Sequence, residues 1–193
     1  MKPTYNAIIL TGEQDLVVRS VNDPAAFGEL YDHYLPRIYK YICYRIGDRH
    51  EAEDLTSRVF ELVLANIRSY HREKGPFAGW IFTIAHNTLT DHLRAQKRKR
   101  FVSIEMLGQI ECAAEAPVDT LVRRERLDEL LKAMTMLSDR ERNIIGLKFA
   151  AGLTNGAISE ITGLTKSNVA VIIYRAVQRL RSDLNAMGWN SDE

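Results

Sequence analysis

Apolar residues recur every three to four positions along most of the chain, which is the spacing of helices buried along one face. Glycine and proline are few, 11 and 5, and fall mainly between these periodic segments. The pattern therefore predicts an all-α protein. We expect helices at roughly 13–21, 24–45, 50–68, 77–98, 120–136, 138–150, 154–161 and 165–185.

One segment interrupts the pattern. Residues 101–117, FVSIEMLGQIECAAEAP, have no steady period and end in small and acidic side chains. We interpret them as a flexible acidic linker between two small helical domains, 1–100 and 118–193. A chain that is 46% hydrophobic can supply each domain with a modest core.

The helix expected after Pro76 carries a polar stripe opposite its apolar face. Hydrogen-bonding groups come first and positive charge follows, with Asp91 as an acid at the edge. The stripe consists of Thr83, His86, Asn87, Thr90, Arg94, Lys97 and Arg98. Such a stripe is commonly a solvated face. Its scarcity of acids favours contact with a polyanion instead.

The helix at 50–67 has the opposite character. Its outer face is mainly acidic and would repel DNA, so a partner on this face is expected to be a protein. This face holds Glu51, Asp54, Arg58 and Glu61. The alternative is structural, because acids in a first turn also stabilise a helix through its dipole.

The loop between these two helices reads SYHREKGPFAGW, residues 69–80. Loops that expose aromatic and basic groups together hold unpaired bases, which makes Arg72, Lys74 and Phe77 candidates for that role. The alternative is that the aromatic residues, Trp80 especially, cover the core.

A helix-turn-helix is predicted near the C-terminus. Ser138 and Glu141 have the spacing of a capping box at the start of one helix. A short helix then leads to a turn at Gly163 and to a longer helix capped by Thr165. In this motif the second helix enters the major groove.

The last helix should bury Val169 and its helical neighbours. The outward residues are then Lys166, Ser167, Asn168, Val171, Ile172, Arg175 and Gln178. A plain amphipathic helix in a bundle is the alternative. The two exposed apolar residues, Val171 and Ile172, suit thymine methyl groups in the major groove.

Composition changes this picture little. Lys and Arg total 26 against 25 acids, so the net charge of +1 makes no global case for nucleic acid, but the block HLRAQKRKR, residues 92–100, is locally basic. Cys43 and Cys112 are far apart, and no metal-ligand cluster or phosphate-binding loop occurs, so no catalytic, metal or cofactor site is predicted. No segment approaches the ~18 apolar residues of a membrane span. We expect a cytoplasmic protein without membrane insertion.

The chain resembles the bacterial RNA polymerase sigma factors of the extracytoplasmic-function (ECF) group. Three segments resemble, in order, the family's second conserved region, and a fourth segment resembles its fourth region. The segments are AFGELYDHYLPRIYKYICYRIGD, HEAEDLTSRVFELVLANI and FAGWIFTIAHNTLTDHLRAQKRK, then LDELLKAMTMLSDRERNIIGLKFAAGLTNGAISEITGLTKSNVAVIIYRAVQRLR.

The resemblance implies function and partners. It implies a non-enzymatic subunit that binds core RNA polymerase, at the clamp helices of the largest subunit and at the flap, and promoter DNA. The acidic helix around Asp54 would bind the clamp. The polar stripe and the loop 69–79 would capture the minus-ten element as the duplex opens, and the last helix would recognise the minus-thirty-five element. An anti-sigma factor is implied as a further partner.

The recognition helix departs from the family pattern. Members often have Lys and Arg where this chain has Ala170 and Ile172. Fewer cations mean weaker attraction to phosphates, so the second domain alone should bind DNA weakly.

Two other functions fit parts of the sequence. A two-domain transcriptional regulator of the response-regulator type would share the helix-turn-helix, but it predicts an α/β receiver or a ligand pocket upstream. A helical adaptor would use the acidic helix alone, and the basic block LRAQKRKR argues against it.

Overall fold

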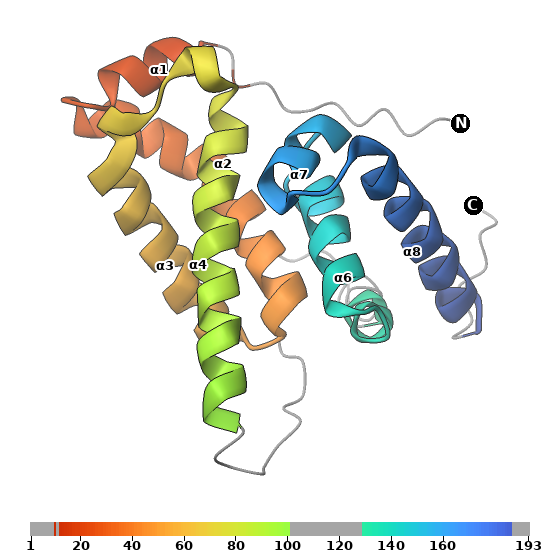
Figure 1. The fold of residues 1–193 in the computed structure, drawn as a ribbon. Helices are drawn as coiled ribbons and strands as arrows, with labels where there is room; N and C mark the ends of the chain where they lie inside the picture. The colour runs from red at the N-terminus through yellow and green to blue at the C-terminus, as the bar shows by residue number, and fades with distance from the viewer. Residues whose placement is uncertain (1–9, 11, 101–128, 187–193) are drawn as a thin grey trace.

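The computed structural model describes residues 10, 12–100 and 129–186, and every regular element among them is helical, which confirms the predicted fold class (Figure 1). The first domain holds α1 (Glu13–Arg19), α2 (Pro24–Ile46), α3 (Arg49–Asn66), the short helices η1 (Ile67–Ser69) and η2 (Arg72–Lys74), and α4 (Phe77–Arg100). The second holds a helix at 129–135, α6 (Asp139–Ile145), η3 (Gly146–Ala150), α7 (Asn155–Thr162) and α8 (Lys166–Ala186).

Local chemistry sets the boundary between α2 and α3. Gly47 adopts a left-handed conformation, φ 77°, that ends α2, because glycine has no Cβ to strain there. The Asp48 carboxylate then accepts a hydrogen bond from the Glu51 amide, 2.8 Å, and begins α3. These two adjacent residues turn the chain so that α3 folds back onto α2.

The core of the first domain surrounds α2, which contacts α1, α3 and α4. Its largest side chains are aromatic and pack edge to face. The Tyr34 ring lies 5.5 Å from that of Phe77, and the Tyr41 ring lies 6.0 Å from that of Phe82. Aromatic burial of this kind gives a small domain much of its apolar area, so α2 and α4 are held in one register.

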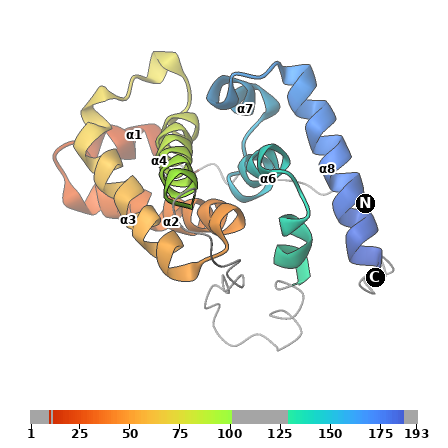
Figure 2. The same cartoon turned by 60° about the horizontal axis from the view of Figure 1, so that its bottom comes forward.

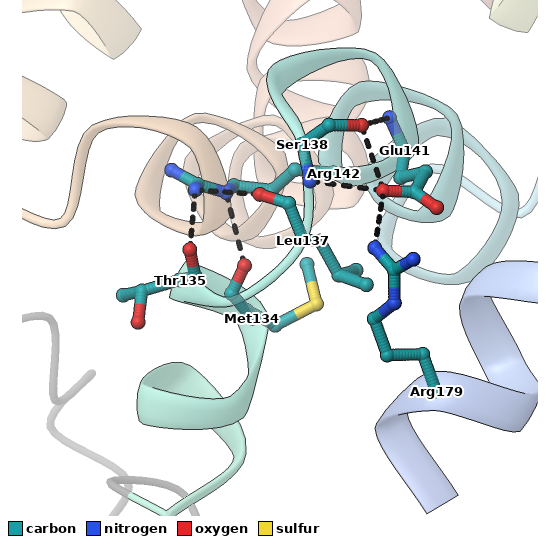
Figure 3. Close-up of polar contacts among 7 residues, drawn as sticks. All are labelled: Met134, Thr135, Leu137, Ser138, Glu141, Arg142 and Arg179. Atoms are coloured by element: carbon teal, nitrogen blue, oxygen red, sulfur yellow. Dashed lines mark hydrogen bonds and ion pairs between the residues drawn. The ribbon is translucent and has the colours of Figure 1, made fainter. Parts of the chain in front are cut away.

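In the second domain, α6 begins with the predicted capping box. The Ser138 hydroxyl accepts from the Glu141 amide, and the Glu141 carboxylate accepts from the Ser138 amide at 2.9 Å. Glu141 also pairs with Arg179 of α8 at 3.1 Å (Figure 3). Arg142 donates to the carbonyls of the preceding turn, those of Met134, Thr135 and Leu137. One turn therefore joins three helices of this domain.

One helix differs from its prediction. A single helix was expected at 138–150, but α6 ends at Ile145 and continues as a π-helical turn, η3. Single π-helical turns within α-helices are rare and occur frequently at functional sites. Here η3 packs against α2 of the first domain.

The two domains lie against each other, an arrangement that the sequence did not predict. α2 contacts η3 and α6, and α4 contacts α7. α3 lies on the far side of α4 from α6, α7 and α8 in both views (Figures 1 and 2). The predicted linker 101–117 is outside the described residues. Within the described ranges, no helix is long and apolar enough to cross a membrane.

Candidate nucleic-acid interface

The polar stripe of α4 divides into two flanks. Asn87 and Asp91 lie on the flank toward α3, while His86 and Lys97 lie on the flank toward the second domain. Arg94 and Arg98 are also exposed on this helix. Helical geometry explains the split, because residues four apart share a face whereas adjacent residues are turned by about 100°.

A hollow of about 490 Å³ opens beside the first flank, between α3 and α4. Its lining combines apolar surface with amide, hydroxyl and carboxylate groups: Leu62, Asn66, Ser69, Trp80, Ile84, Asn87, Thr88 and Asp91. Leu62, Ile84 and Thr88 are only half-buried, because they form the walls of this hollow. A cavity with apolar walls and few polar groups suits a flat ligand with polar edges.

The second flank is tied to the second domain. The Tyr41 hydroxyl donates to Asn143 Oδ1 at 2.8 Å and lies 3.2 Å from His86 Nδ1. Because one hydroxyl proton serves Asn143, the neutral His86 ring donates its own Nδ1 proton to the Tyr41 oxygen. Further along α4, Lys97 Nζ pairs with Asp139 at 2.8 Å. Two residues of the predicted DNA stripe therefore have protein partners.

Stability is expected to respond to pH through His86. Burial, with Arg45 and Arg94 nearby, lowers the pKa of the His86 imidazole below its ordinary value of 6.5, while a hydrogen bond that Asn143 accepts acts in the opposite direction. As the pH falls, His86 of the unfolded chain binds a proton before His86 of the folded protein does. The stability that the neutral, buried ring allows is therefore present above pH 6.5 and is lost as the pH falls. We expect the Tm of the native protein to fall relative to that of His86→Gln between pH 7.5 and 5. If the Tm of the two proteins changed in parallel with pH, His86 would not be the source of the pH dependence.

The loop before α4 is only partly available. Arg72 and Lys74 are exposed in η2, as the prediction requires. Phe77 was predicted to contact DNA, but its ring is 1% exposed and packs 5.3 Å from the Tyr70 ring and 5.4 Å from the Trp80 ring. The prediction for Phe77 is wrong for this conformation, because the ring completes the core instead.

Thr83 and Thr90 are half-buried on α4. The Thr83 hydroxyl donates to the Gly79 carbonyl at 2.8 Å, which is a common way for a helical threonine to satisfy its own donor. Their contribution to a DNA surface therefore remains a prediction.

The acidic face of α3 is exposed at three of its four residues. Asp54, Arg58 and Glu61 face solvent, with Arg58 and Glu61 paired at 2.8 Å. Glu51 is half-buried, and its carboxylate accepts from Gln96 of α4 at 3.0 Å. Glu51 thus differs from its neighbours, since it links α3 to α4 and offers less of its charge to a partner.

The helix-turn-helix has the predicted geometry. Gly163, φ 70°, ends α7, and the Thr165 hydroxyl accepts from the Asn168 amide at 3.2 Å to begin α8. Ser159 donates across the turn to the Leu164 carbonyl. Val169 is fully buried and anchors α8 beneath α7. The turn fixes the angle at which α8 leaves the domain.

The outward face of α8 is free within the described chain. Six of the seven predicted residues are exposed and Ile172 is half-buried; the exposed ones are Lys166, Ser167, Asn168, Val171, Arg175 and Gln178. Tyr174, 67% exposed, shares this face and was not predicted. Its position three residues after Val171 was the available signal.

The comparisons with known proteins agree on one family. The family described as Sigma-70 region 2 matches residues 30–99, and that described as Sigma-70, region 4 matches residues 127–180. The chain is 32% identical over 168 residues to the ECF RNA polymerase sigma factor BldN of Streptomyces coelicolor, covering 86% of this chain and 63% of that protein. It is 30% identical over 171 residues to SigW of Bacillus subtilis, covering 84% and 90%.

Solved structures show the same fold. The complex of CnrH with the cytosolic domain of CnrY matches with a TM-score of 0.67 at 17% identity, over 91% of this chain and 98% of that one. The sigma factor RpoE bound to the anti-sigma factor NepR, from Bartonella quintana, matches with a TM-score of 0.72 at 23% identity, over 82% and 96%. With both conserved regions in order on this fold, the chain belongs to the ECF RNA polymerase sigma factors.

Proposed function

We propose that the protein directs promoter-specific initiation by binding core RNA polymerase, recognising a minus-ten and a minus-thirty-five element, and holding the opened strand. The observation that carries this proposal is the polar hollow beside the stripe of α4, on the domain that matches region 2. The subunit is not an enzyme under this proposal. The free energy for opening comes from binding bases that have left the stack.

The hollow is the proposed site for a flipped base of the minus-ten element. Trp80 and Ile84 supply apolar wall, and Asn87 and Asp91 supply hydrogen-bonding groups at the rim. A carboxylate accepts but does not donate, so Asp91 favours a base with an exocyclic amine, which adenine, cytosine and guanine carry and thymine lacks. Arg94, 3.5 Å from Asp91, would then lie near the backbone of that nucleotide.

The exposed face of α8 is the proposed site for the minus-thirty-five element. Asn168 suits the edge of adenine, Arg175 suits guanine, and Val171 suits a thymine methyl group. Few cations line this face, so the second domain should bind duplex weakly without the rest of the holoenzyme.

The exposed acids of α3 are the proposed contact with the polymerase clamp. Reversing two of them, Asp54→Lys with Glu61→Lys, should weaken binding to core polymerase by roughly tenfold or more, since like charges then oppose across the interface. A pull-down titration of core polymerase measures this. Glu160→Lys, an exposed reversal on α7, is the control and should bind core normally. Equal loss of core binding in the double variant and in the control would reject the assignment of the clamp contact to α3.

An anti-sigma factor is proposed as the regulatory partner. The sigma factor RpoE, which shares this fold, was solved with the anti-sigma factor NepR. Nothing in the described residues identifies the corresponding protein for this chain.

One experiment tests the whole proposal. The purified protein is added to core polymerase and a promoter library, and bound DNA is sequenced. Enrichment of sequences with two spaced elements, dependent on polymerase, is the expected result. Specific duplex binding without polymerase would favour the two-domain regulator, and no association with core would reject the proposal.

A further inference from the structure

We infer that Tyr70 is a positioning residue for base capture. Its hydroxyl holds the loop 70–75 closed, and its ring joins that loop to Trp80, the aromatic wall of the hollow beside α4. The role in base capture rests on the proposed function of the hollow. The closure of the loop rests on contacts among the described residues.

One side-chain bond closes this loop, which lies between α3 and α4 in the chain (Figure 1). The Tyr70 hydroxyl donates to the Gly75 carbonyl at 3.0 Å, and the residues between them form the single turn of η2. Two backbone bonds support the turn, at 3.0 and 3.1 Å, from the amides of Lys74 and Gly75. A loop with so few internal bonds depends on each of them for its shape.

Gly75 adopts a backbone conformation that suits glycine and strains other residues. Its φ of 138° and ψ of 175° lie in a region that only glycine populates readily. A Cβ added there would meet nothing within 4 Å, so backbone strain, rather than crowding, excludes a side chain. Because the Gly75 carbonyl is the acceptor for the Tyr70 hydroxyl, closure needs both residues.

The Tyr70 ring connects the closed loop with the hollow. Its centroid lies 5.7 Å from that of Trp80 and 5.3 Å from that of Phe77, whose ring is buried. Trp80 lines the hollow, and so does Ser69, the residue directly before Tyr70. Tyr70 is thus bonded to the loop at its hydroxyl and contacts the wall of the hollow through its ring, so movement of the loop is transmitted to the wall.

The closed loop also carries two exposed cations, Arg72 and Lys74. The acid between them, Glu73, lies 3.5 Å from His71, measured from carboxylate oxygen to ring nitrogen. An unpaired nucleotide needs an aromatic surface for its base and cations for its phosphate, and the hollow and the loop supply both. Fixing these groups before the strand arrives lowers the entropic cost of binding, so the Tyr70 hydroxyl contributes to affinity without touching DNA.

Tyr70→Phe removes the hydroxyl and keeps the ring. The contacts with Phe77 and Trp80 remain, so we expect the helical circular dichroism of the variant to equal that of the native protein. Tyr31→Phe is the matched control, because it deletes a hydroxyl from a tyrosine of α2 that is 36% exposed. Gly75→Ala opens the same closure through the backbone.

Limited proteolysis of the full chain with trypsin measures closure without reference to function. Cleavage after Arg72 or Lys74 requires the loop to open, so Tyr70→Phe and Gly75→Ala should both raise its rate roughly fivefold, the effect expected from one hydrogen bond. Cleavage elsewhere in the chain should stay unchanged, which separates loop opening from general destabilisation. Unchanged loop cleavage in Tyr70→Phe, or the same increase in Tyr31→Phe, would overturn the inference.

The wall of the hollow has its own readout. Trp80 is one of two tryptophans in the chain, and Trp189→Phe leaves Trp80 as the only one that fluoresces. Acrylamide should quench Trp80 emission more strongly in Tyr70→Phe than in Tyr31→Phe, since an open loop uncovers one edge of the indole ring. Equal quenching would show that the loop does not set the wall, and would remove Tyr70 from base capture.

Capture is measured with holoenzyme assembled from each variant and a fluorescein-labelled, mixed-sequence single-stranded DNA of about 20 nucleotides. Tyr70→Phe should lower the affinity for this strand several-fold relative to Tyr31→Phe, while the affinity for core polymerase stays within about twofold. Faster loop cleavage in Tyr70→Phe with unchanged strand affinity would overturn the positioning role and leave the proposed function intact. Native holoenzyme that binds the strand no better than core polymerase alone would instead reject the hollow as the site of capture, and the proposed function with it.

Discussion

Val169→Asp is expected to unfold the second domain. Val169 is fully buried where α8 crosses beneath α7, so the new carboxylate loses its water and gains no partner. An unpaired buried charge costs several kcal/mol, about 4 or more, which approaches the whole stability expected of a domain of about 60 residues. Circular dichroism of the full chain should lose a corresponding part of its helical signal.

Val171→Asp is the matched control, two residues further along the same helix. Val171 is 45% exposed, so a carboxylate there stays hydrated and the Tm should change little. The new carboxylate would repel the DNA phosphates, and the side chain could no longer make an apolar contact with a thymine methyl group. We expect transcription from promoters with a minus-thirty-five element to fall at least tenfold with the fold intact. If both variants unfold, the orientation of α8 is misassigned.

Most helices could be predicted because local signals agree. The capping box at Ser138 and the turn at Gly163 occur where expected, and α2, α3 and α4 begin within one residue of the predicted positions. Periodicity and capping residues act over a few residues, so they can be recognised without knowing the tertiary structure.

The rest depends on contacts between distant segments. Phe77 and Glu51 were placed on outer surfaces, but their neighbours Tyr70 and Gln96 come from other turns and another helix. The π-helical turn and the packing of Gly146 on Tyr41 involve two domains, and no local pattern encodes that pairing. The hollow beside α4 was also missed, because its walls come from α3 and α4 together.

The second large effect is expected at this hollow. Replacing Asn87 and Arg94 by alanine removes a base-contacting amide and a neighbouring cation, at about 1–3 kcal/mol for a good base contact. Open-complex formation, followed by permanganate reactivity of unpaired thymines, should fall roughly 10- to 100-fold. Binding to core polymerase should remain within about twofold, because both residues lie on α4 and the proposed clamp surface lies on α3. Equal loss of the two activities would mean that the α4 face has been misassigned.

The single variant Asn87→Ala separates base recognition from phosphate attraction. A residue that contacts one flipped base loses discrimination at one position of the non-template strand, whereas a residue that contacts phosphate loses affinity for every sequence alike. Arg98→Ala, an exposed change further along α4, is the comparison, and it should also reduce the salt dependence of binding. Profiling the holoenzyme of each variant on promoters randomised across the minus-ten element distinguishes a base contact from a phosphate contact. A uniform loss for Asn87→Ala would place it among the phosphate contacts and leave the hollow without a base-reading role.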